Sequence, residues 1–249
     1  MRRVHKVLSL FFFLISLISC KDEPAQPVVD RVIETHGGSG YESFRVEFDF
    51  RNRHYTAARN KGQFTYTREF TDSTGKIKDV LDNDGFRRFR NGTVLDLPKE
   101  RKEAFTRSVN SVIYFALLPF GLNDDPVKKE LLQETTIAGQ PYDVVRITFD
   151  QAGGEDHEDV FLYWFHKQNH TMDYFAYSYK VDGGGLRFRE AVNPRVEGGI
   201  RWQDYVNYKP EDESVPLDSL KDMFVSGRLQ KLSEVNMENV VVTGYKEDN

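Results

Sequence analysis

The chain has 249 residues, of which 39% are hydrophobic, 29% charged and 13% aromatic. This apolar fraction is enough to bury a core, so wholesale disorder is excluded. With 18 Gly, 9 Pro and one Cys, neither a collagen-like chain nor a disulfide framework fits. The formal net charge of −5 gives nucleic-acid binding no electrostatic support, so we expect no nucleic-acid partner.

The N-terminal residues have the pattern of an export signal. Arg2, Arg3 and Lys6 precede an apolar run over residues 7–18, which is followed by Cys20. As a helix this run would rise about 18 Å, too short for a hydrocarbon core of about 30 Å. It therefore predicts a signal peptide over residues 1–19 rather than a membrane span.

The end of this run, Leu17-Ile-Ser-Cys20, resembles the lipobox of bacterial lipoproteins. The resemblance implies cleavage before Cys20, diacylglycerol on its sulfur and an acyl chain on the new amine. It also implies the lipoprotein maturation and sorting machinery as partners. Because a single acyl chain anchors a protein only marginally, the several chains at Cys20 would attach this one firmly to the outer membrane. The alternative is a chance Cys in an ordinary secreted protein.

Lys21-Asp22-Glu23 comes directly after the cysteine. It resembles the signal that many Bacteroidota lipoproteins carry for transport to the outer face of the outer membrane. Solvated linker charge is the alternative, so the cell surface is slightly favoured and the periplasmic face stays open. Pro24 and Pro27 stiffen a spacer, and residues 20–27 are predicted to be the acylated Cys and its linker.

Hydrophobic periodicity predicts the elements that follow. One stripe of a short helix is predicted by Val28, Val29, Val32, Ile33 and His36, and Gly37-Gly38 is its C-terminal stop. Residues 46–50, 64–70 and 145–149 alternate apolar and polar side chains, which predicts strands with one buried face. Turn signals separate them at the spacing of consecutive hairpins. Residues 160–165 have no polar face, so we expect a central strand that is covered on both sides.

Two helical segments interrupt the predicted strands. Lys102 to Leu118 has helical spacing and stops at Pro119, and its last seven residues are apolar all round, which is typical of a buried helix. The second segment, Leu217 to Ser226, has one apolar stripe. Residues 235–243 predict a last strand and residues 246–249 a frayed tail. No repeat or composition shift appears, so residues 28–245 are predicted to form a single β-rich domain.

The predicted fold class is mainly β with a few helices. Because twist accumulates across a wide sheet, we expect a strongly curved antiparallel sheet, a half-barrel with helices on its concave side. This plan resembles the half-barrel of the lipoprotein carriers LolA and LolB. The resemblance is architectural and implies room for acyl chains.

Six stretches of the chain resemble an uncharacterised family of Bacteroidota outer-membrane lipoproteins. They are His36-Gly-Gly38 with Tyr41, Phe48-Asp-Phe-Arg51 with His54-Tyr55, and residues 108–122, 158–165, 172–177 and 183–190. The resemblance implies an exported lipoprotein that contains a domain of unknown function.

Motifs for metal binding and catalysis are missing from the sequence. Residues 153–159 place four carboxylates around His157 without the spacing of a calcium loop, so a solvated acidic turn is expected. His166 and His170 bracket a turn but lack a third zinc ligand. There is no G-x-S-x-G elbow and no glycine-rich phosphate loop. We therefore predict no catalytic residue, no cofactor and no metal.

A set of aromatic and cationic residues supplies the candidates for lining a ligand cavity. They are His36, Tyr41, His54, Tyr55, Tyr114, Phe115, Arg187, Arg189 and Arg201. If these side chains point inward, the cavity is amphiphilic, with aromatic walls and cations for a carboxylate or phosphate head. If the polar ones point outward, they are ordinary cross-strand partners of Asp and Glu, which we favour at this stage.

Three functions are consistent with this sequence. The leading hypothesis is a lipid-anchored, non-catalytic envelope protein that binds a lipidic or amphiphilic ligand in a half-barrel cavity. The first alternative is a structural or interaction subunit of an envelope assembly, which would expose a large apolar patch. The second alternative is a hydrolase or isomerase that uses His36 or His54 with a carboxylate.

Overall fold

The computed structural model describes residues 25–150, 158–180 and 183–244. These ranges contain 15 strands and three α-helices, and their strand pairs are antiparallel. The mainly β, antiparallel class predicted from the sequence is confirmed. The predicted signal peptide, Cys20 and the tail at 246–249 lie outside the described residues.

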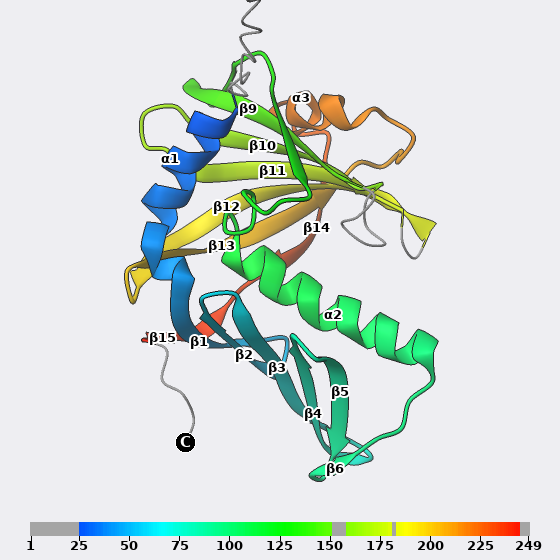
Figure 1. The fold of residues 1–249 in the computed structure, drawn as a ribbon. Coiled ribbons are helices and arrows are strands. Elements are labelled where there is room, and N and C mark those ends of the chain that lie inside the picture. Colours follow the sequence, from blue (N-terminus) through cyan, green and yellow to red (C-terminus); the bar gives the residue numbers. More distant parts are fainter. Residues whose placement is uncertain (1–24, 151–157, 181–182, 245–249) are drawn as a thin grey trace, which may run out of the picture.

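Hydrogen bonding divides the strands into two sheets with helix α2 (Lys99–Leu117) between them (Figure 1). The seven-stranded sheet has the order β15 (Glu238–Thr243), β1 (Ser43–Phe50), β2 (Arg53–Asn60), β3 (Gln63–Asp72), β4 (Gly75–Asp82), β5 (Gly85–Arg90) and β6 (Thr93–Val94). Strands β1 to β6 are a hairpin meander. At the β5–β6 turn both Asn91 and Gly92 have positive φ (47° and 80°), as a two-residue type I′ turn requires.

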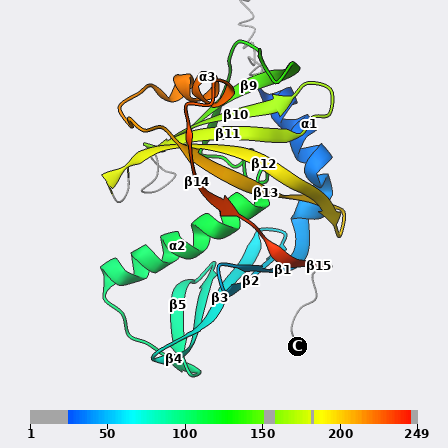
Figure 2. The same ribbon diagram turned by 180° about the vertical axis from the view of Figure 1, so that it is seen from behind.

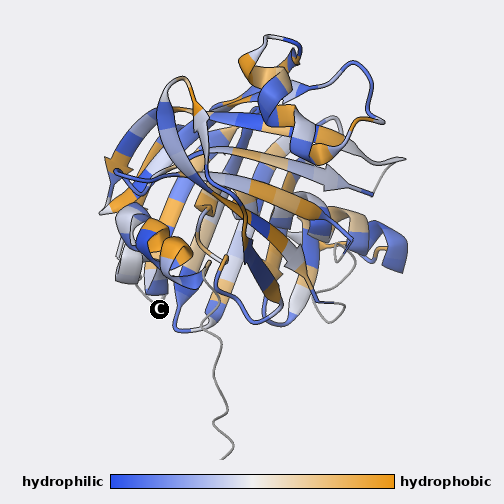
Figure 3. Ribbon diagram, turned by 90° about the horizontal axis from the view of Figure 1, so that it is seen from above, coloured by the Kyte–Doolittle hydropathy of each residue, from blue (hydrophilic) through white to orange (hydrophobic). Residues whose placement is uncertain are grey.

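The eight-stranded sheet contains the strands that are rich in aromatic residues, such as β10 and β11. Its order is β14 (Gln230–Val235), β13 (Ile200–Lys209), β12 (Gly185–Glu197), β11 (Met172–Tyr179), β10 (Val160–His166), β9 (Gln140–Phe149) and β7 (Val127–Leu131). Strand β8 (Thr135–Ile137) also pairs with β9. Hydrophobic and hydrophilic residues alternate along many strands, as the two-residue period of a strand requires (Figure 3).

The C-terminal segment connects the two sheets. Strand β14 pairs with β13 in the eight-stranded sheet, and β15 pairs with β1 in the seven-stranded sheet. Figure 2 shows this segment running from one sheet to the other. The single last strand predicted over residues 235–243 is therefore two strands. The single curved sheet of the prediction is two hydrogen-bonded sheets, and this segment places one strand at the edge of each.

Helix α2 contributes side chains to both sheets. Val109, Ile113 and Leu117 are buried against the seven-stranded sheet, while Tyr114 and Phe115 pack on the core of the eight-stranded sheet. None of the residues 112–118 is exposed. This segment is apolar on all sides because it packs against both sheets. The predicted placement of the segment inside the fold is confirmed.

The other helices cover opposite faces of the eight-stranded sheet. Helix α1 (Gln26–His36) packs on the face toward α2, and its boundary differs from the prediction because Pro27 lies in its first turn rather than in the linker. The segment predicted over 217–226 is a 3₁₀ turn, η4 (Leu217–Ser219), followed by α3 (Leu220–Val225). It packs on the other face, away from α2. A second 3₁₀ turn, η1 (Gly38–Glu42), leads from α1 into β1.

Strand β10 shows how the sheet is covered on both sides. Phe161, Tyr163 and Phe165 belong to the core beneath α1 and α2, whereas Leu162 and Trp164 belong to the core beneath α3. From Phe161 onward its residues are buried. The prediction of a central strand without a polar face is confirmed, and its physical reason is a helix layer on each side.

Candidate functional site

Two cavities lie beside α2. The larger has a volume of about 590 Å³ and the smaller about 180 Å³. Ser111 and Phe115 line both cavities, one turn of α2 apart. The cavities therefore share one stretch of helix. The eight-stranded sheet lines both, and the seven-stranded sheet contributes Phe48 and Phe50 to the smaller one.

The wall of the larger cavity is aromatic. Its rings are those of Tyr114, Phe115, Phe149, Phe161, Tyr177 and Tyr179. Centroid separations of 5.4 Å for Phe115–Tyr177 and 5.2 Å for Phe161–Tyr177 show that the rings pack on one another. Strands place them here because alternate residues of β9, β10 and β11 project toward α2. Such a wall offers an apolar surface to a ligand.

The rim of the larger cavity is polar. The polar side chains that line this cavity are Arg107, Ser108, Asn110 and Ser111 of α2, together with Asp159 and Arg187. The Arg187 guanidinium donates a 2.7 Å hydrogen bond to the Tyr179 hydroxyl and lies 3.3 Å from a Glu213 carboxylate oxygen. Arg187 is thus held at the rim by both an aromatic wall residue and an acidic neighbour.

Tyrosine hydroxyls near the cavities stay protonated at neutral pH. Burial raises the pKa of Tyr114 and of Tyr205 to about 12. Burial likewise raises the pKa of Tyr163, whose hydroxyl lies 3.5 Å from that of Tyr114. These groups act as neutral donors and acceptors rather than as bases.

Arg189 reaches into the interior from β12. Its residue is 8% exposed, its guanidinium lies 4.1 Å from the Phe115 ring centroid, and it donates a 3.0 Å hydrogen bond to the Tyr177 hydroxyl. The outward orientation favoured from the sequence is therefore wrong for Arg189. The reason is that β12 is covered on both faces: Leu186 and Phe188 pack beneath α3, so the alternate residues face α2.

Four of the nine predicted lining residues border a cavity. Tyr114 and Arg187 line the larger one, Arg189 the smaller, and Phe115 both. Their role toward a ligand stays a prediction. His36, Tyr41, His54, Tyr55 and Arg201 line neither of these two cavities.

The remaining five have other positions. His36, Tyr41 and Tyr55 are fully packed in the protein interior, and Tyr55 stacks on Phe48 at 5.4 Å. His54 is half-exposed on β2, where its Nδ1 lies 2.9 Å from an Asp49 carboxylate oxygen. Arg201 is half-buried on β13. This geometry gives the histidine-based hydrolase no support, because neither His36 nor His54 lines either of the two cavities beside α2.

Several lining residues were missed at the sequence level. The predicted strands over residues 145–149 and 160–165 contain Phe149 and Phe161 without giving them a lining role, and Tyr177 and Asn207 have no predicted role. A signal was present in β10 and β11, where aromatic residues recur on both sides of the alternation. Only the position of α2 decides which of these faces borders a cavity.

The described residues contain neither a metal-binding cluster nor a helix that could span a membrane. Within the ranges given above, no cluster of three or more His, Cys, Asp or Glu side chains has the arrangement of a metal site. Residues 153–157 of the acidic turn around His157 lie outside the described part of the chain. In the described part, no helix has the length and apolar character needed to cross a bilayer.

Comparison with known proteins identifies the family. A model of a family of unknown function, DUF6503, matches residues 5–237. The chain belongs to this family. The expectation of a family without established activity is thereby confirmed, while the Bacteroidota origin stays a prediction. No protein of curated function matches the DUF6503 chain.

Solved structures resemble the DUF6503 chain only distantly. A LolA superfamily protein from Nitrosomonas europaea is 11% identical, with a TM-score of 0.46 over 88% of this chain and 91% of that one. A DUF1329 family protein from Desulfovibrio piger is 12% identical, with a TM-score of 0.44 over 88% and 93%. A lipoprotein-sorting protein domain from Vibrio parahaemolyticus is 11% identical, with a TM-score of 0.38 over 89% and 94%. With TM-scores below 0.5, these likenesses carry no argument about function.

Proposed function

We propose that this protein is a lipid-anchored envelope protein that holds a lipidic or amphiphilic ligand in a half-barrel cavity, between α2 and the eight-stranded sheet, without catalysing a reaction. The observation that carries the proposal is the larger cavity, which combines an aromatic wall with a polar rim. Its volume of about 590 Å³ lies within the range of about 300–1,000 Å³ typical of small-molecule sites.

The chemistry of this cavity favours an amphiphile over a polar metabolite. Six aromatic rings face a ligand on one side, and side chains that form hydrogen bonds gather at the rim. Transfer of an acyl chain from water to such a wall is favourable, by about 0.8 kcal/mol for each buried CH₂. A polar head group cannot pack on this wall and needs partners that form hydrogen bonds, so a molecule with both an apolar and a polar part fits the lining better than a wholly polar one.

The anchor completes the proposal. The lipobox-like Leu17-Ile-Ser-Cys20 supports acylation at Cys20 and attachment to the outer membrane. Lys21-Asp22-Glu23 supports the cell surface, and the periplasmic face is the alternative. The partners that follow are the outer membrane, the lipoprotein maturation and sorting machinery, and the ligand.

No specific observation favours the interaction-subunit alternative. The large apolar side chains that stand exposed on the described part of the chain are Val94, Val196, Val225, Leu232 and Val241. They belong to five different elements. Single exposed apolar residues are ordinary on protein surfaces and do not define a docking site.

Native mass spectrometry after gentle extraction tests the proposal. The wild-type protein should carry lipid-sized additional mass, or take up dodecanoate or dodecan-1-ol when it is offered. Ser111→Trp places a large ring where both cavities meet and should lower this uptake at least about tenfold, the effect of about 1.4 kcal/mol. Lys102→Trp, on an exposed turn of the same helix outside both cavities, is the matched control. Ligand-free wild-type protein that takes up neither probe would contradict the proposal.

A further inference from the structure

Two polar residues of the smaller cavity have buried atoms without hydrogen-bond partners. Arg189 on β12 and Asn207 on β13 are direct cross-strand neighbours, and both line this cavity. Within the described part of the protein, Arg189 Nε and Asn207 Oδ1 have no partner. Each residue is 8% exposed. Buried polar atoms are nearly always paired, so two unpaired polar groups side by side in one cavity are available to a group that enters it.

The charge of Arg189 is also uncompensated. Its guanidinium contacts the Tyr177 hydroxyl and the rings of Phe115 and Phe175, which are neutral groups. Among the described residues, no carboxylate lies within ion-pair distance of it. Removing a charge from water without an ionic partner is costly, because neither a hydroxyl nor an aromatic face replaces a counter-ion.

The other walls of the smaller cavity add no negative charge. Apart from Arg189, its polar lining consists of Arg51, Ser111, Tyr205 and Asn207, and no Asp or Glu lines it. The Tyr205 hydroxyl already accepts a 3.2 Å hydrogen bond from the Gln203 amide. Two arginines with no acid give the cavity a positive potential, which selects an anion.

The rest of the lining is apolar. Phe48, Phe50, Val112, Ala116, Val235 and Met237 surround the polar pair. A free inorganic anion would leave these side chains without contact, whereas the first methylene groups of a chain would pack against them. An anionic group attached to an alkyl chain therefore fits both parts of the lining.

We propose that Arg189 and Asn207 bind the head group of an anionic amphiphile, a carboxylate or phosphate monoester, in the smaller cavity. Arg189 donates to the anionic oxygens through its guanidinium, as in charge-assisted pairs elsewhere. Asn207 donates to the same oxygens through Nδ2 after its amide turns over, so that Oδ1 accepts from the Ser233 hydroxyl, to which Nδ2 now donates at 3.4 Å. This inference rests on the proposed function and specifies the class of ligand.

Matched probes test the head-group site. Dodecanoate and dodecan-1-ol have the same chain and differ in charge, and acetate has the charge without the chain. In equilibrium binding, the wild-type protein should prefer dodecanoate over dodecan-1-ol at least about tenfold. Arg189→Met should abolish this preference by weakening dodecanoate binding alone, and Arg189→Lys should retain part of it. Arg146→Met is the matched control, because it makes the same change at an arginine outside both cavities. Arg146 forms exposed ion pairs with Glu130 and Asp218, and its variant should keep the full preference for dodecanoate.

A second variant covers the case in which Arg189→Met does not fold. Asn207→Asp places a carboxylate directly opposite Arg189, so it supplies the missing anion from within the protein. It should fold, melt at a higher temperature than wild type and lose the preference for dodecanoate.

Equal binding of dodecanoate and dodecan-1-ol by the wild type would overturn the inference and leave the proposed function standing. Competition by acetate at the same concentration as dodecanoate would reduce the site to one for small anions and also overturn it. Absence of binding for both twelve-carbon probes would overturn the two proposals together.

Discussion

The imidazole Nε2 of His36 lies 3.1 Å from the backbone nitrogen of Met172, whose N–H donates a hydrogen bond to it across 136 residues of sequence. This bond joins the end of α1 to the start of β11. The ring has no exposed surface, and its Nδ1 has no partner within the described residues. Because Nε2 accepts a bond, the ring is neutral and carries its proton on Nδ1.

We expect His36 to make the protein sensitive to mild acid. Burial, with a smaller contribution from Arg201, lowers the pKa of His36 to about 3, from 6.5 in the unfolded chain. Between pH 6.5 and about 3, His36 therefore binds a proton in the unfolded state but not in the folded state. Stability from the neutral ring is complete above pH 6.5 and is lost as the pH falls toward 3, at up to about 1.4 kcal/mol for each pH unit.

His36→Gln is the comparison for this effect, since its amide oxygen replaces the acceptor but does not titrate. Urea unfolding of both proteins between pH 7 and 4.5 should show a steeper decline for the wild type. Coincident slopes would mean that His36 titrates in the folded protein as it does in the unfolded chain.

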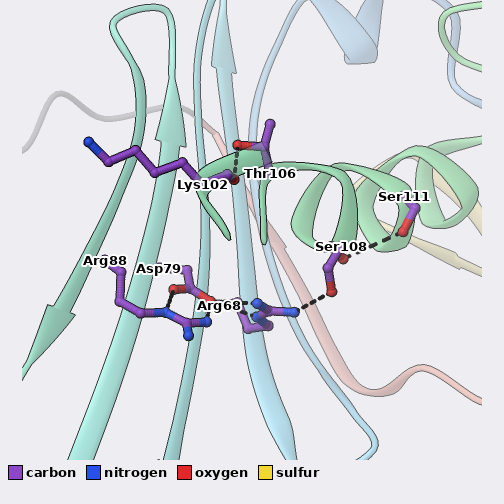
Figure 4. A network of polar contacts seen from close by, with 7 residues as sticks. All are labelled: Arg68, Asp79, Arg88, Lys102, Thr106, Ser108 and Ser111. Atoms are coloured by element: carbon purple, nitrogen blue, oxygen red, sulfur yellow. Dashed lines mark hydrogen bonds and ion pairs between the residues drawn. The ribbon is translucent and has the colours of Figure 1, made fainter. Parts of the chain in front are cut away.

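A second prediction concerns the buried ions beneath α2. Asp79 has no exposed surface and accepts hydrogen bonds from Arg68 at 2.6 Å and from Arg88 at 2.6 Å, while Arg68 also donates to Ser108 of α2 (Figure 4). Asp79→Asn removes the only carboxylate that these arginines share in the described structure. Leaving buried charges without a partner should lower the free energy of unfolding by about 3–5 kcal/mol.

Glu69→Gln is the matched control for Asp79→Asn. Glu69 and Lys78 form a cross-strand pair on β3 and β4, like Arg68 and Asp79, at a similar distance of 2.9 Å, but both side chains are about half exposed. An exposed pair contributes at most about 1 kcal/mol. Thermal or urea denaturation should therefore separate the two variants clearly. Equal effects would show that burial of the Asp79 cluster adds nothing.

The strands that could be predicted are those in which apolar side chains are buried and polar side chains are not. In β1, Phe44, Val46 and Phe48 are buried and the polar residues between them are not, so alternation identified both the strand and its inner face. In β10 the lack of any polar face identified a strand covered on both sides. In these elements the local pattern and the tertiary environment agree, and the local pattern was sufficient.

The site was harder to predict because polarity and burial disagree there. In β12, Leu186 and Phe188 suggest that Arg187 and Arg189 face water, yet α2 and α3 cover both faces of this strand. In β3, Arg68 lies on the face of buried Tyr66, where its partner Asp79 comes from another strand. A single sequence does not show which helix covers which face, so the buried arginines followed only from the tertiary structure.

Anchoring is a third prediction, and it concerns a residue outside the described part of the chain. Cys20→Ser should abolish acylation, because Cys20 is the only thiol in the sequence. The protein should then leave the membrane fraction, stay attached through an uncleaved signal, or be degraded. Labelling with radioactive fatty acid and fractionation measure this. Uptake of label by the Ser variant would contradict the lipobox interpretation.

The last prediction separates the two faces of α2. Ile113 is fully buried against the seven-stranded sheet, whereas Phe115 borders both cavities, with the Arg189 guanidinium 4.1 Å from its ring centroid. Ile113→Asp puts an unpaired charge in an apolar core and should cost several kcal/mol of the 5–15 kcal/mol of a typical domain. Phe115→Asp places its carboxylate near Arg189, which compensates the charge, so it should melt closer to wild type. It should nevertheless lose binding of dodecanoate, because an internal anion replaces the ligand's. Thermal melts and binding assays on both variants measure this difference. If Phe115→Asp melts as low as Ile113→Asp, or if it binds dodecanoate as wild type does, Arg189 is not the cation that binds the head group.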